Sequence, residues 1–96
     1  MPVSKLSQEA DQDFASIYVY GFHTFGSAQV DLYALHLIGS FERLAQYPLS
    51  GIARPGLADG LRSSACSSHV IYYLPEEGEC LIVRILHQSQ DPLRYI

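Results

Sequence analysis

Two histidines, two arginines and a pair of tyrosines are the side chains of this 96-residue sequence that could act together in a reaction. His69 or His87 could serve as acid or base, and the cations Arg62 and Arg84 could hold a phosphate. The adjacent Tyr72-Tyr73 could stack on bases, so RNA cleavage is the chemistry that this set would support. Each residue also has a structural interpretation, since histidines at strand ends bond to backbone and an arginine in an apolar strand pairs with an acid. Both interpretations stay open.

The charge balance argues against strong direct binding to nucleic acid. Six Lys and Arg residues face ten Asp and Glu residues, which gives a formal net charge of −4. Proteins that bind phosphates tightly carry clustered basic surface, because released counterions supply most of that affinity. The sequence has no such cluster.

Cofactor motifs are missing from the sequence. It contains no GxGxxG, no GxxxxGK[ST], no HExxH and no paired Cys/His spacing, so we expect neither a nucleotide cofactor nor a metal. Asp11 and Asp13 stand two residues apart in a predicted helix and point to different faces. We interpret them as part of a solvated face.

The first residues and the cysteines bear on location. Met1 to Lys5 are not followed by a sustained apolar stretch, so we expect neither a secretory signal nor a membrane span, and a cytoplasmic protein. Cys66 and Cys80 would stay thiols in a reducing cytosol.

Two amphipathic helices are predicted for the first half of the chain. Ser7 can cap a helix from Gln8, which Gly26 ends, and Ser27 can cap a second helix that Pro48 ends. Apolar residues repeat at spacings of three and four in both helices: Ala10, Phe14, Ile17, Tyr18, Gly21 and Phe25, then Val30, Ala34, Leu37, Phe41 and Leu44. The short connection predicts an αα-hairpin whose two stripes face one surface.

Three antiparallel strands are predicted for the second half. Prolines and glycines from Pro48 to Gly60 indicate a loop, and the runs 61–67, 69–74 and 80–87 are rich in β-branched and aromatic residues. Helices grouped before strands predict an α+β fold, with an N-terminal αα-hairpin on a small antiparallel sheet, in a single domain over residues 1–96. At ~3.3 Å per residue, such a meander separates Cys66 from Cys80 by on the order of 20 Å, too far for a disulfide.

The strands do not alternate cleanly between apolar and polar residues. In 80–87 apolar side chains fall on both faces, although two helices can cover only one face of the sheet. Either the loop 48–60 or the C-terminal tail folds over the second face, or a partner protein covers it.

Several short strings, in order along almost the whole chain, resemble the ParE branch of the RelE/ParE toxin superfamily. They are Leu6-Ser7-Gln8-Glu9-Ala10-Asp11-Gln12-Asp13-Phe14 with Ile17 and Tyr20, Phe25-Gly26 with Gln29 and Tyr33, Phe41 and Leu44-Ala45 with Pro48 and Gly51, Gly60-Leu61-Arg62, His69-Val70-Ile71-Tyr72-Tyr73, and Arg84-Ile85-Leu86-His87 with Asp91 and Arg94.

The resemblance implies the toxin of a type II toxin–antitoxin system, which inhibits DNA gyrase by binding it without catalysis and is neutralised by a ParD-like antitoxin. We therefore expect a hetero-oligomer with that antitoxin and no membrane partner. A ribosome-dependent mRNA endonuclease of the RelE type is the alternative. An inert descendant that only binds antitoxin is a third, because Ile52 and Ser89-Gln90 depart from the family's pattern.

Contact residues can be nominated for both partners. Arginine and tyrosine are frequent anchors of protein interfaces. The candidates for target contact are Arg62, Tyr72, Arg84, His87 and Arg94. The candidates for antitoxin contact lie outside the internal stripes and are Leu32, Leu35, Ile82 and Leu86. Leu32 and Leu35 have a second interpretation, in which they only widen the buried face of their helix.

Overall fold

A computed structural model describes residues 3–96 of the chain. Helix α1 (Gln8–Phe25) and helix α2 (Ser27–Gln46) form the predicted hairpin. The Ser7 hydroxyl accepts a hydrogen bond from the Ala10 amide and donates one to the Val83 carbonyl, which fixes where α1 begins. Gly26 separates the helices with φ of 90°, a backbone conformation that suits glycine. Helix α1 begins after Ser7 as expected, but α2 already includes Ser27, its N-cap is Gly26 and no side chain caps it, so the prediction of Ser27 as a cap was wrong.

The sheet is larger than the predicted meander. The strands β3 (Arg62–Cys66), β4 (His69–Glu76) and β5 (Glu79–His87) form the expected antiparallel core. A two-residue strand, β2 (Ile52–Ala53), adds to β3, and β1 (Val3–Leu6) runs parallel to β5. The sheet is therefore mixed and five-stranded, in the order β1-β5-β4-β3-β2. A short 3₁₀ turn, η1 (Pro92–Arg94), follows β5.

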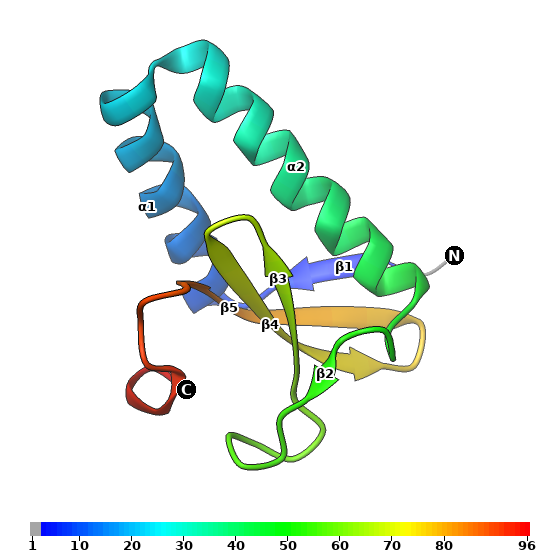
Figure 1. The fold of residues 1–96 in the computed structure, drawn as a ribbon. Helices are drawn as coiled ribbons and strands as arrows, with labels where there is room; N and C mark the ends of the chain where they lie inside the picture. The colour runs from blue at the N-terminus through cyan, green and yellow to red at the C-terminus, as the bar shows by residue number, and fades with distance from the viewer. Residues whose placement is uncertain (1–2) are drawn as a thin grey trace.

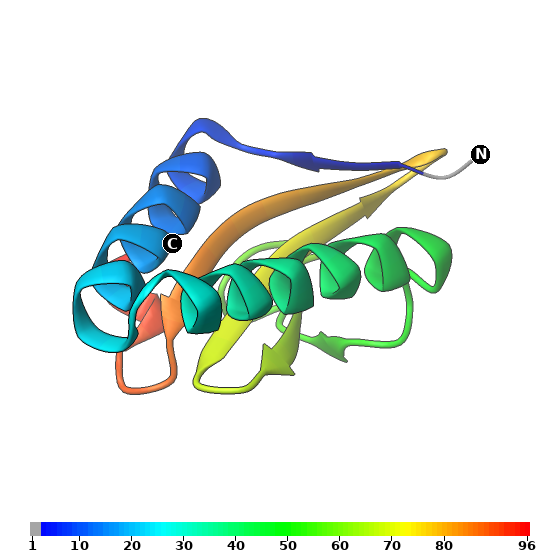
Figure 2. The ribbon, with the colours of Figure 1, turned by 90° about the horizontal axis from the view of Figure 1, so that it is seen from above.

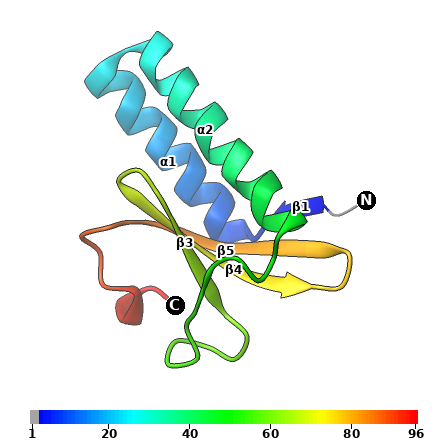
Figure 3. The ribbon, with the colours of Figure 1, turned by 45° about the vertical axis from the view of Figure 1, so that its right-hand side comes forward.

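One face of the sheet carries the hairpin, as Figures 1 and 2 show. The main core fills this layer, with residues from both helices packed on Ile71, Tyr73 and Ile82 of the sheet. Tyr73 also donates to the Pro48 carbonyl and accepts from the Gly51 amide, so it fastens the chain that leaves α2. In Figure 3 the connection between the helices lies at the end of the hairpin away from β2.

The second face is covered by the chain itself. Leu61, Tyr72 and Leu86 form a smaller core there, and Leu57 from the loop and Ile96 from the C-terminal end pack against it. Of the two explanations left open by the strand pattern, the one that needs no partner is therefore correct for this face. The loop and the tail both contribute to this cover.

Both cysteines are free and buried, and the sequence predicted no disulfide between them. Burial, and then the charge of Glu76, raise the pKa of the Cys80 thiol to about 11. Across the described helices, none is long and apolar enough to span a membrane.

Candidate functional site

Exposed large apolar side chains gather on the two helices of the hairpin, and the edge strands of the sheet add Val3 and Ile52. Leu32 is 69% exposed, Leu35 64% and Tyr20 68%, and these belong to a larger set of apolar side chains in contact with solvent. The full set on the hairpin is Val19, Tyr20, Phe22, Phe25, Leu32, Leu35 and Ile38. Patches of this kind on small proteins usually mark an interaction surface. Phe25, expected to complete the buried stripe of α1, is 57% exposed and belongs to this surface.

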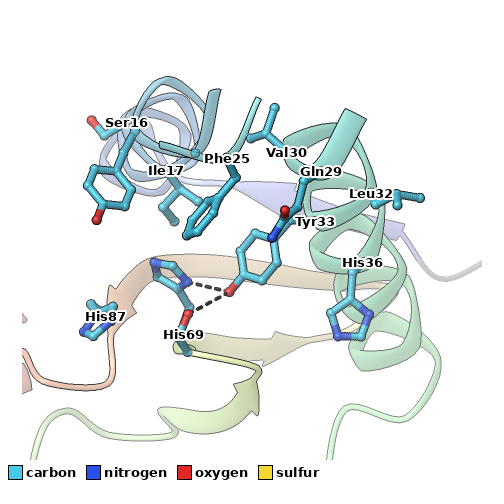
Figure 4. Close-up of a pocket in the computed structure, with 13 residues that line it drawn as sticks. Ser16, Ile17, Phe25, Gln29, Val30, Leu32, Tyr33, His36, His69 and His87 are labelled. Atoms are coloured by element: carbon cyan, nitrogen blue, oxygen red, sulfur yellow. Dashed lines mark hydrogen bonds between the residues drawn. The ribbon is translucent and has the colours of Figure 1, made fainter. Parts of the chain in front are cut away.

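A groove of about 790 Å³ opens where the hairpin meets the ends of β4 and β5, and Figure 4 shows the residues around it. We call it the hairpin groove. Its walls are apolar side chains of both helices, among them Ile17, Phe25 and Val30. Its opposite end is polar, with His69 and His87 from the two strands. Gly21 lets the helices approach closely, because a Cβ there would lie 2.7 Å from Cγ2 of Val30.

Three side chains are joined at the polar end of the groove. The Tyr33 hydroxyl lies 2.6 Å from Nδ1 of His69 and 3.3 Å from the Cys66 carbonyl oxygen. The imidazole of His69 meets that of His87 edge to face, with 5.4 Å between ring centroids, because the two residues pair in the β4–β5 ladder. Burial, and then repulsion from His87, lower the pKa of His69.

Arg84 and Asp13 form a second polar cluster away from the groove. The guanidinium donates from Nε and Nη2 to the two carboxylate oxygens at 2.8 and 2.9 Å, and from Nη1 to the Tyr95 carbonyl. The same carboxylate accepts the Ile85 amide. The pKa of Arg84 is raised, chiefly by its hydrogen bond to Asp13. The interpretation of Asp13 as solvated was wrong, since β5 brings a cation to it, and the pairing of Arg84 with an acid is confirmed.

The five target-contact candidates differ in exposure and in their bonds within the fold. Arg94 and His87 are exposed, whereas Arg62 donates to the Gly51 carbonyl at 2.7 Å and Arg84 is held by Asp13. Tyr72 is only 5% exposed and lies in the smaller core, so nominating it for contact was wrong.

The antitoxin-contact candidates also divide in two. Leu32 and Leu35 project into solvent, so neither widens the buried face of α2. Ile82 is 0% exposed in the main core and Leu86 1% exposed in the smaller one, so both choices were wrong. The reason is that β5 is a central strand covered on both faces.

The residues proposed for RNA cleavage do not form one site. His69 and His87 meet at the groove, but neither Arg62 nor Arg84 lines it. Sequence reasoning missed Tyr33 as the partner of His69, because the two residues are 36 positions apart and nothing local connects them.

Comparison with known proteins agrees with this fold. Residues 5–92 match the family model described as the ParE toxin of the type II toxin–antitoxin system parDE. Toxin ParE1 of Caulobacter vibrioides is 33% identical over 87 residues, covering 91% of this chain and 90% of the relative. Toxin ParE of Escherichia coli is 35% identical over 89 residues, covering 90% and 84%.

A solved structure has the same fold at low identity. It is described as a chromosomal ParDE TA system from P. aeruginosa and superposes with a TM-score of 0.75 at 19% identity, covering 91% of this chain and 95% of the other. The chain therefore belongs to the ParE toxin family of type II toxin–antitoxin systems.

Proposed function

We propose that this ParE-family chain inhibits bacterial DNA gyrase by binding it, without catalysis, and that a ParD-like antitoxin neutralises it in the cytoplasm. Family membership over residues 5–92 is the observation that carries the proposal. The engagement of Arg62 and Arg84 in bonds within the fold supports a binder over a nuclease, since RNA cleavage calls for cations that are free to hold a phosphate.

The apolar hairpin supports the antitoxin half of the proposal. Its exposed side chains, such as Leu32, Leu35 and Phe22, are spread over both helices and suit the apolar face of an amphipathic segment. The solved ParDE relative pairs this fold with an antitoxin by its own description, so the neighbouring reading frame should encode one here.

A gyrase assay separates the alternatives. Purified gyrase should lose supercoiling activity and accumulate cleaved DNA in the presence of the chain, and added antitoxin should restore supercoiling. A translation extract should show intact transcripts under the same conditions. Cut transcripts with unaffected gyrase would support the nuclease, and no effect on either would support an inert descendant.

Arg94 is the best remaining candidate for contact with the target, because it is exposed and lies on η1 beside the C-terminus. Arg94→Ala should weaken gyrase inhibition by about tenfold while leaving the thermal melting temperature unchanged. Lys5→Ala, at an exposed position on β1, is the matched control. Equal inhibition by both variants would remove Arg94 from the contact surface.

A further inference from the structure

We propose that His69 and His87 form a carboxylate-binding subsite at the polar end of the hairpin groove, filled by an acidic side chain on an apolar helix of the antitoxin. The inference rests on the antitoxin role proposed above and adds the chemistry by which the partner is recognised.

The hydrogen bonds of His87 fix which ring nitrogen is free. The Ser89 amide donates to Nδ1 of His87 at 3.1 Å, and a backbone N–H can only donate. The neutral ring therefore carries its proton on Nε2. This atom has no hydrogen bond to another described residue, so it is a donor available to a partner.

The bonds of His69 give a different arrangement. The Tyr33 hydroxyl donates to the Cys66 carbonyl at 3.3 Å, so its oxygen accepts the 2.6 Å hydrogen bond from Nδ1–H of neutral His69. Nε2 of the neutral ring is then an acceptor, and it lacks a bonded partner among the described residues. In Figure 4 the second ring nitrogen of His69 faces away from Tyr33.

Tyr33 also lets His69 take up a proton without losing a bond. A proton that adds to Nε2 leaves Nδ1–H donating to the Tyr33 oxygen, whose own proton stays on the Cys66 carbonyl. The charged ring then presents Nε2–H to the groove, as His87 does in its neutral form. A partner that binds both rings must therefore supply an acceptor.

The charges around the groove select a carboxylate as that acceptor. No Asp, Glu, Lys or Arg is among the 13 residues drawn around it in Figure 4. The titratable groups that line the groove with His69 are Tyr20 from α1, Tyr33 and His36 from α2, and His87 from β5. A carboxylate meets no competing carboxylate there, whereas a lysine would meet no opposite charge.

The shape of the groove indicates a helix as the carrier of this carboxylate. A volume of about 790 Å³ exceeds one side chain and suits several apolar anchors in a row. The walls formed by Ile17, Val30 and Leu32 match the helix-in-groove mode, in which anchors recur every three or four residues.

Binding should be coupled to proton uptake. Burial and His87 keep the pKa of His69 low in the free chain, so the ring is neutral at pH 7. A carboxylate placed against Nε2 favours the charged ring. Affinity for an acidic partner should therefore increase as the pH falls.

The subsite can be tested with 4-phenylbutyrate and its uncharged analogue 4-phenyl-1-butanol. The chain is made by cell-free synthesis, and binding is followed by NMR of the histidine rings. At pH 6 the acid should bind about tenfold more tightly than the alcohol, and the ratio should decline by pH 8. Equal affinities, or one ratio at every pH, would overturn the proposal.

Variants test which residues cause the preference for the acid over the alcohol. His69→Gln should lose the preference for the acid, while His23→Gln, at an exposed position on α1 outside the groove, should keep it. Tyr33→Phe removes the acceptor of Nδ1–H, so the charged ring loses a bond and the preference for the acid at pH 6 should be smaller. If His69→Gln does not fold, the pH profile of the unaltered chain with the two probes still decides the matter.

A second experiment measures binding of the antitoxin itself. Calorimetry in phosphate and Tris buffers should show proton uptake on complex formation near pH 7. One Asp→Asn or Glu→Gln change in its apolar segment should abolish that uptake. No effect of any such change would overturn the proposal, as would sedimentation showing that a second copy of the chain fills the groove. Gyrase inhibition does not enter these measurements, so a failure here is distinct from a failure of the proposed function.

Discussion

Asp13 of α1 and Arg84 of β5, which are 71 residues apart in sequence, form a two-point ion pair that joins the hairpin to the sheet. The guanidinium also lies over the Tyr95 ring, 5.7 Å from its centroid, so the C-terminal segment is attached to the same pair. Arg84 thus serves as a junction between the first helix, the last strand and the chain end.

Loss of the Asp13 charge should destabilise the protein. Asp13→Asn leaves Arg84 without its counterion and weakens the bond to the Ile85 amide, so the free energy of unfolding should fall by about 2–3 kcal/mol. Urea denaturation measures this. Asp11→Asn, two residues earlier and exposed, is the control and should cost less than about 1 kcal/mol. Equal effects would mean that the ion pair contributes nothing.

Two glycine substitutions should act in opposite directions. Gly21→Ala forces a methyl group against Val30 and should destabilise the helix pair by about 1–3 kcal/mol. Gly39→Ala, on α2 with open space around it, should stabilise the chain by about 0.5–1 kcal/mol through helix propensity. Thermal melts of both variants test the pair, and a neutral Gly21→Ala would show that the helices can separate freely.

An exposed leucine of the hairpin should matter for the partner more than for the fold. Leu35→Ser should weaken antitoxin binding by at least about tenfold with an unchanged melting temperature, because the side chain is 64% exposed. Leu49→Ser, at a position 70% exposed outside the hairpin, should bind as the unaltered chain does. Similar affinities for the two variants would place the antitoxin elsewhere.

Stability should depend on pH through His69. Its pKa in the folded chain is lowered, so the unfolded chain binds the proton more readily and protonation favours unfolding. The stabilisation is complete above the unfolded value of about 6.5 and is lost as the pH falls through the lower, folded value. Chemical denaturation from pH 7.5 to 5 should show this slope, and His69→Gln should flatten it. If the variant kept the same change of stability with pH, titratable groups other than His69 would be its cause.

Local features made the helices predictable, whereas pairings between distant segments were not. Ser7 and Gly26 fix helix ends through their immediate neighbours, and the structure agrees for both residues, although Ser27 does not cap α2. The pairing of Val3–Leu6 with β5 carries no local pattern, because four residues of weak alternation gain their partner only in the folded sheet.

The exposed helix residues of the candidate site could be predicted from the sequence, whereas the burial of the strand residues could not. The helical period of α2 places Leu32 and Leu35 away from the core, and both are exposed. The burial of Leu86 depends on Leu57 and Ile96, which arrive from a loop and from the chain end. No periodicity within a strand reveals what will cover it.

The parallel pairing of β1 with β5 joins the first strand of the chain to its last. A ribosome therefore releases the hairpin long before the strand that completes the sheet, and Val3–Leu6 must wait for Glu79–Ile82 to emerge. The sheet can be completed only after translation has nearly ended. A stop codon between α2 and β5 would therefore leave β1 without its neighbour, even though both helices would still be synthesised.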